Sequence, residues 1–359
     1  MCSSDLPGRS APPSTYREAG VDPDSKEAIL AGVRTRIRST YRDPVLGSGD
    51  GFAGLFRLAG YRDPVLVSSI DGVGTKTRIA AALGRWQVVG ADVVSHGAND
   101  VLCCGAAPLF MLDYVASRVL DAEAITGVLG GIVEACRDQG IVLLGGETAE
   151  MPGVYVKSEV DIVGATVGVV ERDRVITGEA IRPGDVIVGI ASDGLHTNGY
   201  SLARAVLLPD GAHQGAALRR ALEKVPRGLS EPLGDALLAP HRPYARPVLA
   251  VRQRVEIRGI AHVTGGGIPG NLVRILPQGC RARIDPGRWP APSLFAVIQK
   301  RGRIADGEMF RTFNMGLGLL LVVREGEGAP AVSQLEASGE RAWIVGRIAA
   351  GPRGVEIRA

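Results

Sequence analysis

The chain has 359 residues, of which 45% are hydrophobic and 22% charged, a globular composition with room for two domains. Its 41 basic and 38 acidic residues are interspersed and give a net charge of +3, so the sequence offers no basic surface for nucleic acid. Aromatic residues make up only 4%, which disfavours base stacking, and no apolar run approaches the roughly 20 residues that span a bilayer. We therefore expect neither nucleic acid nor a membrane as a partner.

The first residues and the cysteines indicate the compartment. Residues 1–13 are polar and rich in Pro and Ser, without the basic start and apolar centre of a signal peptide, and are predicted to be a disordered lead. The five cysteines include no CxxC pair, which favours reduced, mostly buried thiols. A cytoplasmic protein is expected.

In the N-terminal half, short apolar runs alternate with helical patterns, which indicates an α/β or α+β fold. A strand is predicted at 65–70, followed by a turn at 71–74 and a helix over 76–83 that Gly84 ends. Asp121 is the predicted N-cap of a helix that runs to 138 and stops at Gly140. Further strands are predicted at 141–144 and 160–170.

The pattern restarts after a Gly- and Pro-containing turn at 182–185. We place a domain boundary near residue 178, which gives an N-terminal domain over 14–178 and a C-terminal α/β domain over 179–359. Residues 208–232 are polar and irregular and are predicted to be a surface excursion. The other predicted C-terminal elements are strands at 186–191, 260–263, 317–323 and 343–348 and helices at 200–207 and 269–276.

Two glycine patterns bear on nucleotide binding. Residues 49–54 fit GxGxxG, but the apolar run before them is too short for the first strand of a dinucleotide fold. A flexible loop in which Gly49 and Gly51 approach a phosphate is the favoured interpretation, with a plain turn as the alternative. The P-loop pattern is absent because Lys76 follows Thr75 rather than glycine, so nucleotide phosphates would need another cradle.

Four acidic residues stand beside glycines or apolar runs: Asp71, Asp92, Asp100 and Glu147. Interpreted as residues at the ends of buried strands, they would converge on one cleft, where carboxylates suit Mg²⁺. Each acid alone is better explained as a helix cap or a turn residue. The four together, with Lys76 nearby, favour a site for a nucleotide and a metal ion.

Two of the five histidines lie in polar, glycine-containing loops. His196 and His262 therefore suit ligand contact or proton transfer. His96 precedes two cysteines, but their spacing fits no common zinc site, so a core position is expected. His213 and His241 give no signal.

Five segments carry a family resemblance. Residues 69–76, 145–153, 196–201, 262–267 and 308–316 closely resemble, in order, the motifs of the phosphoribosylformylglycinamidine cyclo-ligase (aminoimidazole ribonucleotide synthetase) family. The resemblance runs from about residue 16 to 348. It implies an N-terminal sheet that pairs with that of a second subunit into a barrel, and a C-terminal α/β domain beside it. It also implies the ATP-dependent conversion of formylglycinamidine ribonucleotide to 5-aminoimidazole ribonucleotide through a phosphorylated amide, a step of purine biosynthesis.

The resemblance also implies roles for particular residues. The metal-site acids would be Asp71, Asp100 and Glu147, with Asp92 in support. The catalytic candidates are Lys76, His196 and His262, and the tentative substrate contacts are Asn198, Gly265 and Gly266. The ATP contacts would be Gly49, Gly51, Gly72, Gly74, Thr75, Lys76, Asn99, His262 and Thr264.

Related activities stay open to different degrees. A selenophosphate-forming kinase would carry a reactive cysteine in the N-terminal glycine loop, and residues 47–54 contain none. A hydrogenase-maturation dehydratase would end in a reactive cysteine, whereas this chain ends in Ala359. A thiamine-phosphate kinase and a non-catalytic binding relative remain as alternatives. The intact acids, Lys76 and loop histidines disfavour the non-catalytic relative.

Overall fold

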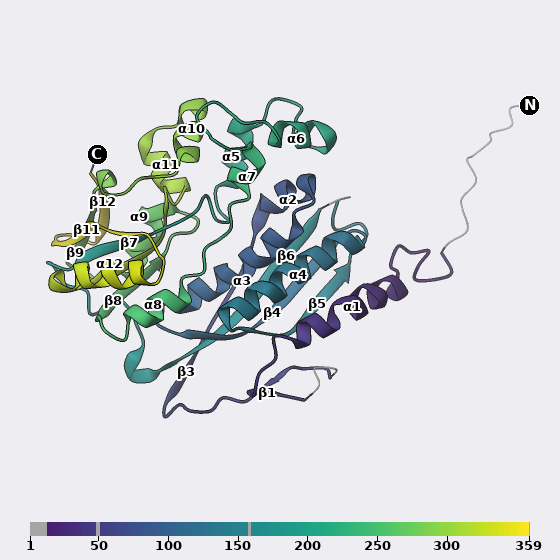
Figure 1. Cartoon of the computed structure of the whole chain (residues 1–359), viewed down its shortest axis with the longest axis horizontal. Helices are drawn as coiled ribbons and strands as arrows, with labels where there is room; N and C mark the ends of the chain where they lie inside the picture. Colours follow the sequence, from purple (N-terminus) through teal and green to yellow (C-terminus); the bar gives the residue numbers. More distant parts are fainter. Residues whose placement is uncertain (1–12, 48–50, 157–158, 359) are drawn as a thin grey trace, which may run out of the picture.

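Two β-sheets organise the chain in the computed structural model, which describes residues 13–47, 51–156 and 159–358 (Figure 1). The N-terminal sheet has four strands in the order β3-β6-β4-β5, and the C-terminal sheet has six in the order β12-β9-β11-β7-β10-β8. The predicted two-domain α/β class is confirmed. None of the described helices combines the length and the apolar composition that crossing a membrane requires.

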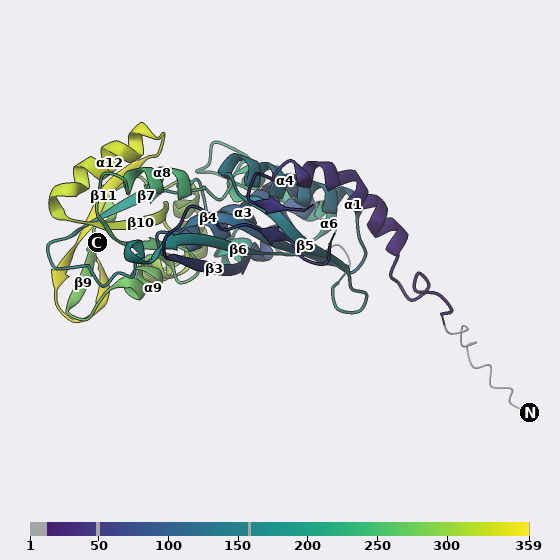
Figure 2. The ribbon, with the colours of Figure 1, turned by 90° about the horizontal axis from the view of Figure 1, so that it is seen from below.

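The N-terminal sheet has helices on one face only. Figure 2 shows α3 and α4 above the strands, with α1 beside α4, while the opposite face carries none of the described helices. Strand β6 is antiparallel to both β3 and β4, and β5 is parallel to β4. The strands are β3 (Pro64–Gly72), β4 (Ala107–Ser117), β5 (Val142–Glu150) and β6 (Val160–Glu171); the helices are α1 (Pro23–Arg38), α2 (Thr77–Leu83), α3 (Trp86–Leu102) and α4 (Ala122–Gln139).

Local capping signals explain the elements that the sequence predicted well. The Asp121 carboxylate accepts a hydrogen bond from the Ala124 N–H at 2.8 Å and begins α4, and Gly140, in the left-handed conformation, ends it. Gly84 ends α2 in the same way. The predicted strand positions of β3 and β6 are confirmed.

Helix α3 contradicts the interpretation of the residues around Asp92 as the end of a buried strand. The segment is a 17-residue helix in which almost every residue is buried. A helix that is buried on all sides lacks the apolar stripe by which amphipathic helices are found, so its sequence is easily mistaken for a buried strand.

The C-terminal sheet is covered on both faces. Helices α8 and α12 pack against one face, and α9 packs against the other. Strands β7 and β10 are buried along their whole length, in agreement with their continuous apolar sequences. The elements are β7 (Val186–Ala191), α8 (Ala245–Val251), β8 (Ile257–His262), α9 (Gly267–Leu272), β9 (Cys280–Ile284), β10 (Leu317–Val323), α12 (Gly328–Ala337), β11 (Ala342–Ala350) and β12 (Gly354–Ile357).

A third group of helices joins the two halves. Their buried side chains belong to the same hydrophobic cluster as α3 and α4, so one core crosses the boundary between the halves. The prediction of an irregular excursion over 208–232 is wrong, because α6 lies there and buries Leu218 and Leu222. The helices are α5 (Tyr200–Leu207), α6 (Gly215–Leu222), α7 (Leu233–Leu237), α10 (Ser293–Gly302) and α11 (Asp306–Thr312); a short hairpin of β1 (Val45–Leu46) and β2 (Leu55–Phe56) precedes β3.

Candidate active site between the two sheets

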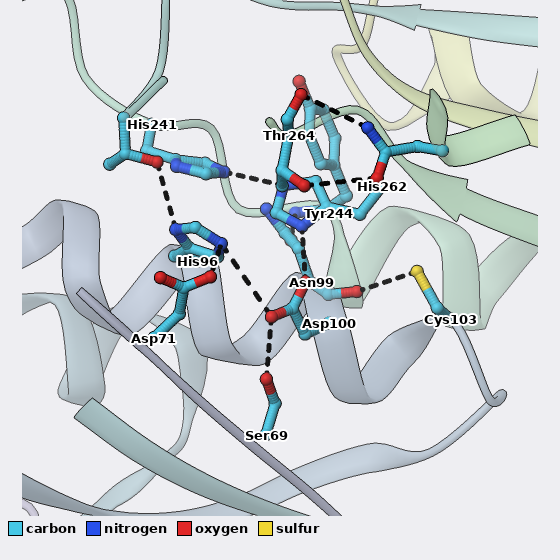
Figure 3. Close-up of polar contacts among 12 residues, drawn as sticks. Ser69, Asp71, His96, Asn99, Asp100, Cys103, His241, Tyr244, His262 and Thr264 are labelled. Carbon is cyan, nitrogen blue, oxygen red and sulfur yellow. Dashed lines mark hydrogen bonds and ion pairs between the residues drawn. The ribbon is translucent and has the colours of Figure 1, made fainter. Parts of the chain in front are cut away.

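Two carboxylates meet where β3 ends beside α3. Asp71 is near the end of β3, and Asp100 lies one turn after His96 on α3, so the side chains of His96 and Asp100 share a helix face. The His96 Nε2 atom is 3.1 Å from Asp71 Oδ2 and 3.8 Å from Asp100 Oδ2 (Figure 3). The hydrogen bond from His96 lowers the pKa of Asp71, so this carboxyl group is ionised at neutral pH.

Asp100 is held by both halves of the chain. The Ser69 hydroxyl of β3 donates to Asp100 Oδ2 at 2.7 Å, and His262 Nδ1, at the end of β8, is 2.8 Å from Asp100 Oδ1 (Figure 3). Burial alone would raise the pKa of Asp100, but the hydrogen bonds from His262 and Ser69, together with the nearby His96, outweigh burial and lower it. We call this junction of β3, α3 and the end of β8 the seam. It holds two ionised, partly exposed carboxylates, and a hard divalent cation requires oxygen donors of this kind.

Four of the five histidines cluster behind these acids. His241 Nε2 lies 2.9 Å from His262 Nε2, and the His196 ring stacks on His241 with 4.0 Å between ring centroids and 18° between planes. Burial lowers the pKa of His196, His241 and His262. These three histidines are close enough to share a metal ion, but two of the rings are stacked rather than convergent.

Lys76 and Asp92 lie deeper than the sequence predicted. Both side chains are 0% exposed, and Lys76 Nζ is 2.6 Å from Asp92 Oδ2. Burial lowers the pKa of Lys76 and raises that of Asp92, each opposed by the other's charge. Each side chain is therefore enclosed with its partner, and neither is exposed beside Asp71 and Asp100.

Asn99 and Glu147 also differ from their predicted positions. The Asn99 side chain is buried and bonded to backbone of the C-terminal half, which leaves it no part in contacting ATP here. Glu147 lies on β5, at the opposite edge of the sheet from β3, roughly 14 Å away along the sheet at about 4.8 Å per strand. Its carboxylate pairs with Lys26 Nζ at 2.7 Å. Glu147 thus cannot share one ion with Asp71 and Asp100 of the same chain.

Three loops border the two carboxylates. Gly74 and Thr75, in the turn after β3, are exposed, and Gly72 is half-buried. The Asn198 side chain approaches Gly265, so two of the tentative substrate residues are neighbours. Thr264 and Gly266 belong to the same loop as Gly265, which follows β8. Gly51 is exposed in a separate loop, and Gly49 lies outside the described residues.

Sequence comparisons cover both halves of the chain. The profile described as AIR synthase related protein, N-terminal domain, matches residues 53–170, and the corresponding C-terminal profile matches residues 182–358. The chain is 49% identical over 340 residues to the phosphoribosylformylglycinamidine cyclo-ligase of Myxococcus xanthus (strain DK1622), over 94% of this chain and 96% of the relative. The chain belongs to the phosphoribosylformylglycinamidine cyclo-ligase family. The cyclo-ligase of Carboxydothermus hydrogenoformans is 46% identical over 345 residues, which are 96% of this chain and 98% of the relative.

Solved structures of other proteins share the fold of this cyclo-ligase family member. Hydrogenase maturation protein HypE in complex with ATP aligns with a TM-score of 0.66 and 17% identity, over 95% of this chain and 93% of that chain. Thiamine-monophosphate kinase from Stenotrophomonas maltophilia K279a aligns with a TM-score of 0.62 and 17% identity, over 92% and 95%. At these identities the likeness establishes the shared fold alone.

Two polar residues of the cyclo-ligase site region were missed by sequence reasoning. His241 follows an apolar run and precedes Arg-Pro, a context without glycines that gave no reason to single it out. Asn271, on α9, donates to the Gly267 carbonyl at 2.8 Å and to the Thr264 and Gly265 carbonyls at 3.2 Å, so it fixes the glycine loop. The one signal in the sequence was an amide residue placed four residues after a run of three glycines.

Proposed function

We propose that this chain catalyses the ATP-dependent closure of formylglycinamidine ribonucleotide to 5-aminoimidazole ribonucleotide, with release of ADP and phosphate. The observation that carries the proposal is the pair of ionised carboxylates, Asp71 and Asp100, at the seam of a chain that is nearly half identical to named cyclo-ligases along almost its whole length.

The chemistry explains why such an enzyme needs positioning more than a nucleophile. An amide oxygen leaves poorly, so it first attacks the γ-phosphorus, and the bond from that phosphorus to ADP breaks. The amidine nitrogen of the same molecule then attacks the activated carbon, phosphate departs with the oxygen, and a nitrogen-bound proton is lost. Because ring closure is intramolecular, correct folding of the substrate can supply about 7–11 kcal/mol.

The described residues fit a Mg²⁺ ion. Asp71 and Asp100 present oxygen atoms that are not consumed by Ser69, His96 or His262, since each carboxylate oxygen accepts more than one bond. A bound Mg²⁺ would offset negative charge on the transferred phosphoryl group. The exposed backbone of Gly74 and Thr75 is placed to donate to phosphates.

The loops on the C-terminal side suit the substrate. We assign Asn198, Gly265 and Gly266 to substrate contact, because they lie together at the open side of the histidine cluster. His262 and Thr264 border the nucleotide, and His196 is assigned to proton transfer or substrate orientation. Lys76, Asp92 and Asn99 support the site from behind.

Asp100→Asn tests the function. With ATP, Mg²⁺ and formylglycinamidine ribonucleotide, the wild-type protein should form the aminoimidazole, and the variant should lose about 100-fold or more in kcat, because one metal-facing charge is removed. Asp210→Asn, at an exposed loop position, is the matched control and should retain full activity. Unchanged turnover and Mg²⁺ dependence in Asp100→Asn would remove the metal assignment. ADP release without the imidazole would favour a small-molecule kinase related to thiamine-monophosphate kinase.

We also propose a homodimer built on the open face of the N-terminal sheet. Leu66, Ile70 and Leu112 on that face are 61%, 71% and 42% exposed, and a groove of about 800 Å³ lies over β4 and β5. Pairing of two such faces would bury these side chains and complete a barrel. Since the described cysteines, Cys103, Cys104, Cys136 and Cys280, are free thiols, we propose that the dimer works in the reducing cytoplasm.

A further inference from the structure

The 239–244 segment connects α7 to α8 and carries His241, which lies beside His96 on the side away from Asp71 (Figure 3). Side chains of the N-terminal half form hydrogen bonds with the backbone of this segment. Lys76 Nζ donates to the Ala239 carbonyl at 2.8 Å, and the His241 N–H donates to Asp92 Oδ1 at 2.7 Å. The residues predicted to bind ATP and metal are therefore used to place His241.

The next residues of the segment are fixed from both sides. Asn99 Nδ2 donates to the Arg242 carbonyl and Asn99 Oδ1 accepts from the Tyr244 N–H, both at 2.8 Å. The Arg242 guanidinium group donates to both carboxylate oxygens of Asp193, at 2.8 and 3.0 Å. The Tyr244 hydroxyl donates to the Ala191 carbonyl at 2.7 Å. So many bonds over so few residues leave the His241 backbone little freedom.

A chain of hydrogen bonds runs from His241 to Asp100. An ionised Asp100 only accepts hydrogen bonds, so His262 Nδ1, at 2.8 Å, must carry the proton. The Nε2 atom of a neutral His262 then has a free lone pair, and His241 Nε2, at 2.9 Å, must be its donor. This assignment leaves His241 Nδ1 without a proton, and that buried atom has no hydrogen-bond partner among the described residues.

Packing confines the His241 ring as well. Its near-parallel stack on His196 fixes the ring plane, and Tyr244 in turn lies against His196. Gly318 on β10 makes this packing possible, since a Cβ at that position would overlap both the Tyr244 hydroxyl and the His196 ring. The ring that donates to His262 is thus held at its backbone and at its face.

We propose that His241 is a positioning residue, whose Nε2–H holds the His262 ring in the direction from which its Nδ1–H fixes the Asp100 carboxylate for a cation. The His241 side chain touches neither carboxylate, and its contribution is the direction of the His262 ring. The link to cyclisation rests on the proposed function, whereas the tautomer and the cation affinity do not. Outer partners of this kind change metal affinity by about 10- to 100-fold when removed.

Two substitutions at His241 separate donation from packing. His241→Phe keeps an aromatic ring for the stack on His196 but removes the donor, and His241→Gln keeps an N–H donor without the ring. His213→Phe, in a surface loop outside the cluster, is the control. We would record ¹⁵N–¹H spectra of the histidine side chains in the nucleotide-free protein, and the Mg²⁺ concentration that half-saturates ATP binding by calorimetry.

In the wild type and in His213→Phe, His262 should be a single Nδ1–H tautomer. In His241→Phe the contact with Asp100 should retain the Nδ1–H tautomer, but the His262 ring signals should shift or broaden as the ring loses its fixed direction. The Mg²⁺ requirement should rise 10- to 100-fold, and His241→Gln should restore most of the loss. An Nε2–H tautomer in the wild-type protein would overturn the proposal whether or not any variant folds. So would equal losses in His241→Phe and His241→Gln, which would show a packing role. An absence of cyclisation with the expected tautomer and Mg²⁺ effects would overturn the proposed function instead.

Discussion

At the scale of single residues, Asp113 is a buried acid, and its ionisation opposes folding. It lines a cavity of about 240 Å³ between α1, α4 and β5. Burial raises its pKa to about 7, and the charge of Glu147 adds to the increase. The same group has a pKa of about 3.9 in an unfolded chain. Between those two values the unfolded chain has lost the proton and the native protein retains it, so the free energy of unfolding falls as pH rises from about 4 to about 7.

We therefore expect the wild type to lose on the order of 4 kcal/mol at most over that range, with no further loss from this group above it. Asp113→Asn cannot ionise, so its stability should be independent of this transition and should exceed that of the wild type at pH 8. Urea unfolding from pH 5 to 8 without nucleotide or Mg²⁺ measures both curves. Parallel curves for the two proteins would contradict the assignment.

The contrast between two pairs of residues shows what the sequence could predict at this scale. Asp71 and His262 were singled out because both stand next to glycine turns at the ends of apolar runs, and the structure brings them to one seam. Lys76 and Asp92 looked similar, yet they are buried. Their burial depends on the 239–244 segment, more than 140 residues further along the chain, and no local pattern reports that contact.

At the scale of elements, α3 joins the halves through one polar stripe. His96 follows Asp92 by four residues, and Asn99 and Asp100 follow His96 by three and four, so the four side chains lie along one side of a mostly apolar helix. A search for helical spacing among the polar residues, rather than the apolar ones, would have identified this helix. The stripe also explains why α3 is buried without being a purely hydrophobic helix.

The buried ion pair between Lys76 and Asp92 of α3 leads to a stability prediction. Lys76→Met should lower the free energy of unfolding by about 3–5 kcal/mol, because Asp92 is left charged and unpaired. The double variant Lys76→Met with Asp92→Leu should recover only part of this, since the His241 N–H then loses its acceptor. Urea denaturation measures the values. Arg219→Met, which breaks the exposed pair with Glu223, should change stability by about 1 kcal/mol or less. Equal effects of the two single substitutions would show that Lys76 is solvated.

At the scale of the whole molecule, the order of sheet and helix segments was largely predictable, whereas the shared core was not. Strands β7 and β10 could be located because each is a continuous apolar run. The packing of α6 against α2 joins segments more than 130 residues apart, and α5 and α10 contribute to the same core, which periodicity alone cannot reveal.

The dimer prediction belongs to this scale. Ile70→Lys places a charge on the open face of the N-terminal sheet and should shift the protein from dimer to monomer, because pairing would bury that charge. Sedimentation velocity measures the mass, and circular dichroism verifies that the variant is folded. Val225→Lys replaces another exposed apolar residue, in the other half, and should leave the mass unchanged. A monomeric wild type, or a dimeric Ile70→Lys, would contradict the proposed interface.

The same open face has a consequence for how the protein is made. A newly synthesised chain that has folded but has not met a second copy presents an apolar sheet face flanked by two free edges, β3 and β5. Unpaired edges beside exposed apolar side chains are templates for disordered aggregation. Expression yield should therefore depend on how fast the proposed subunits associate. Slow synthesis at low chain concentration would increase aggregation, because each chain stays monomeric for longer.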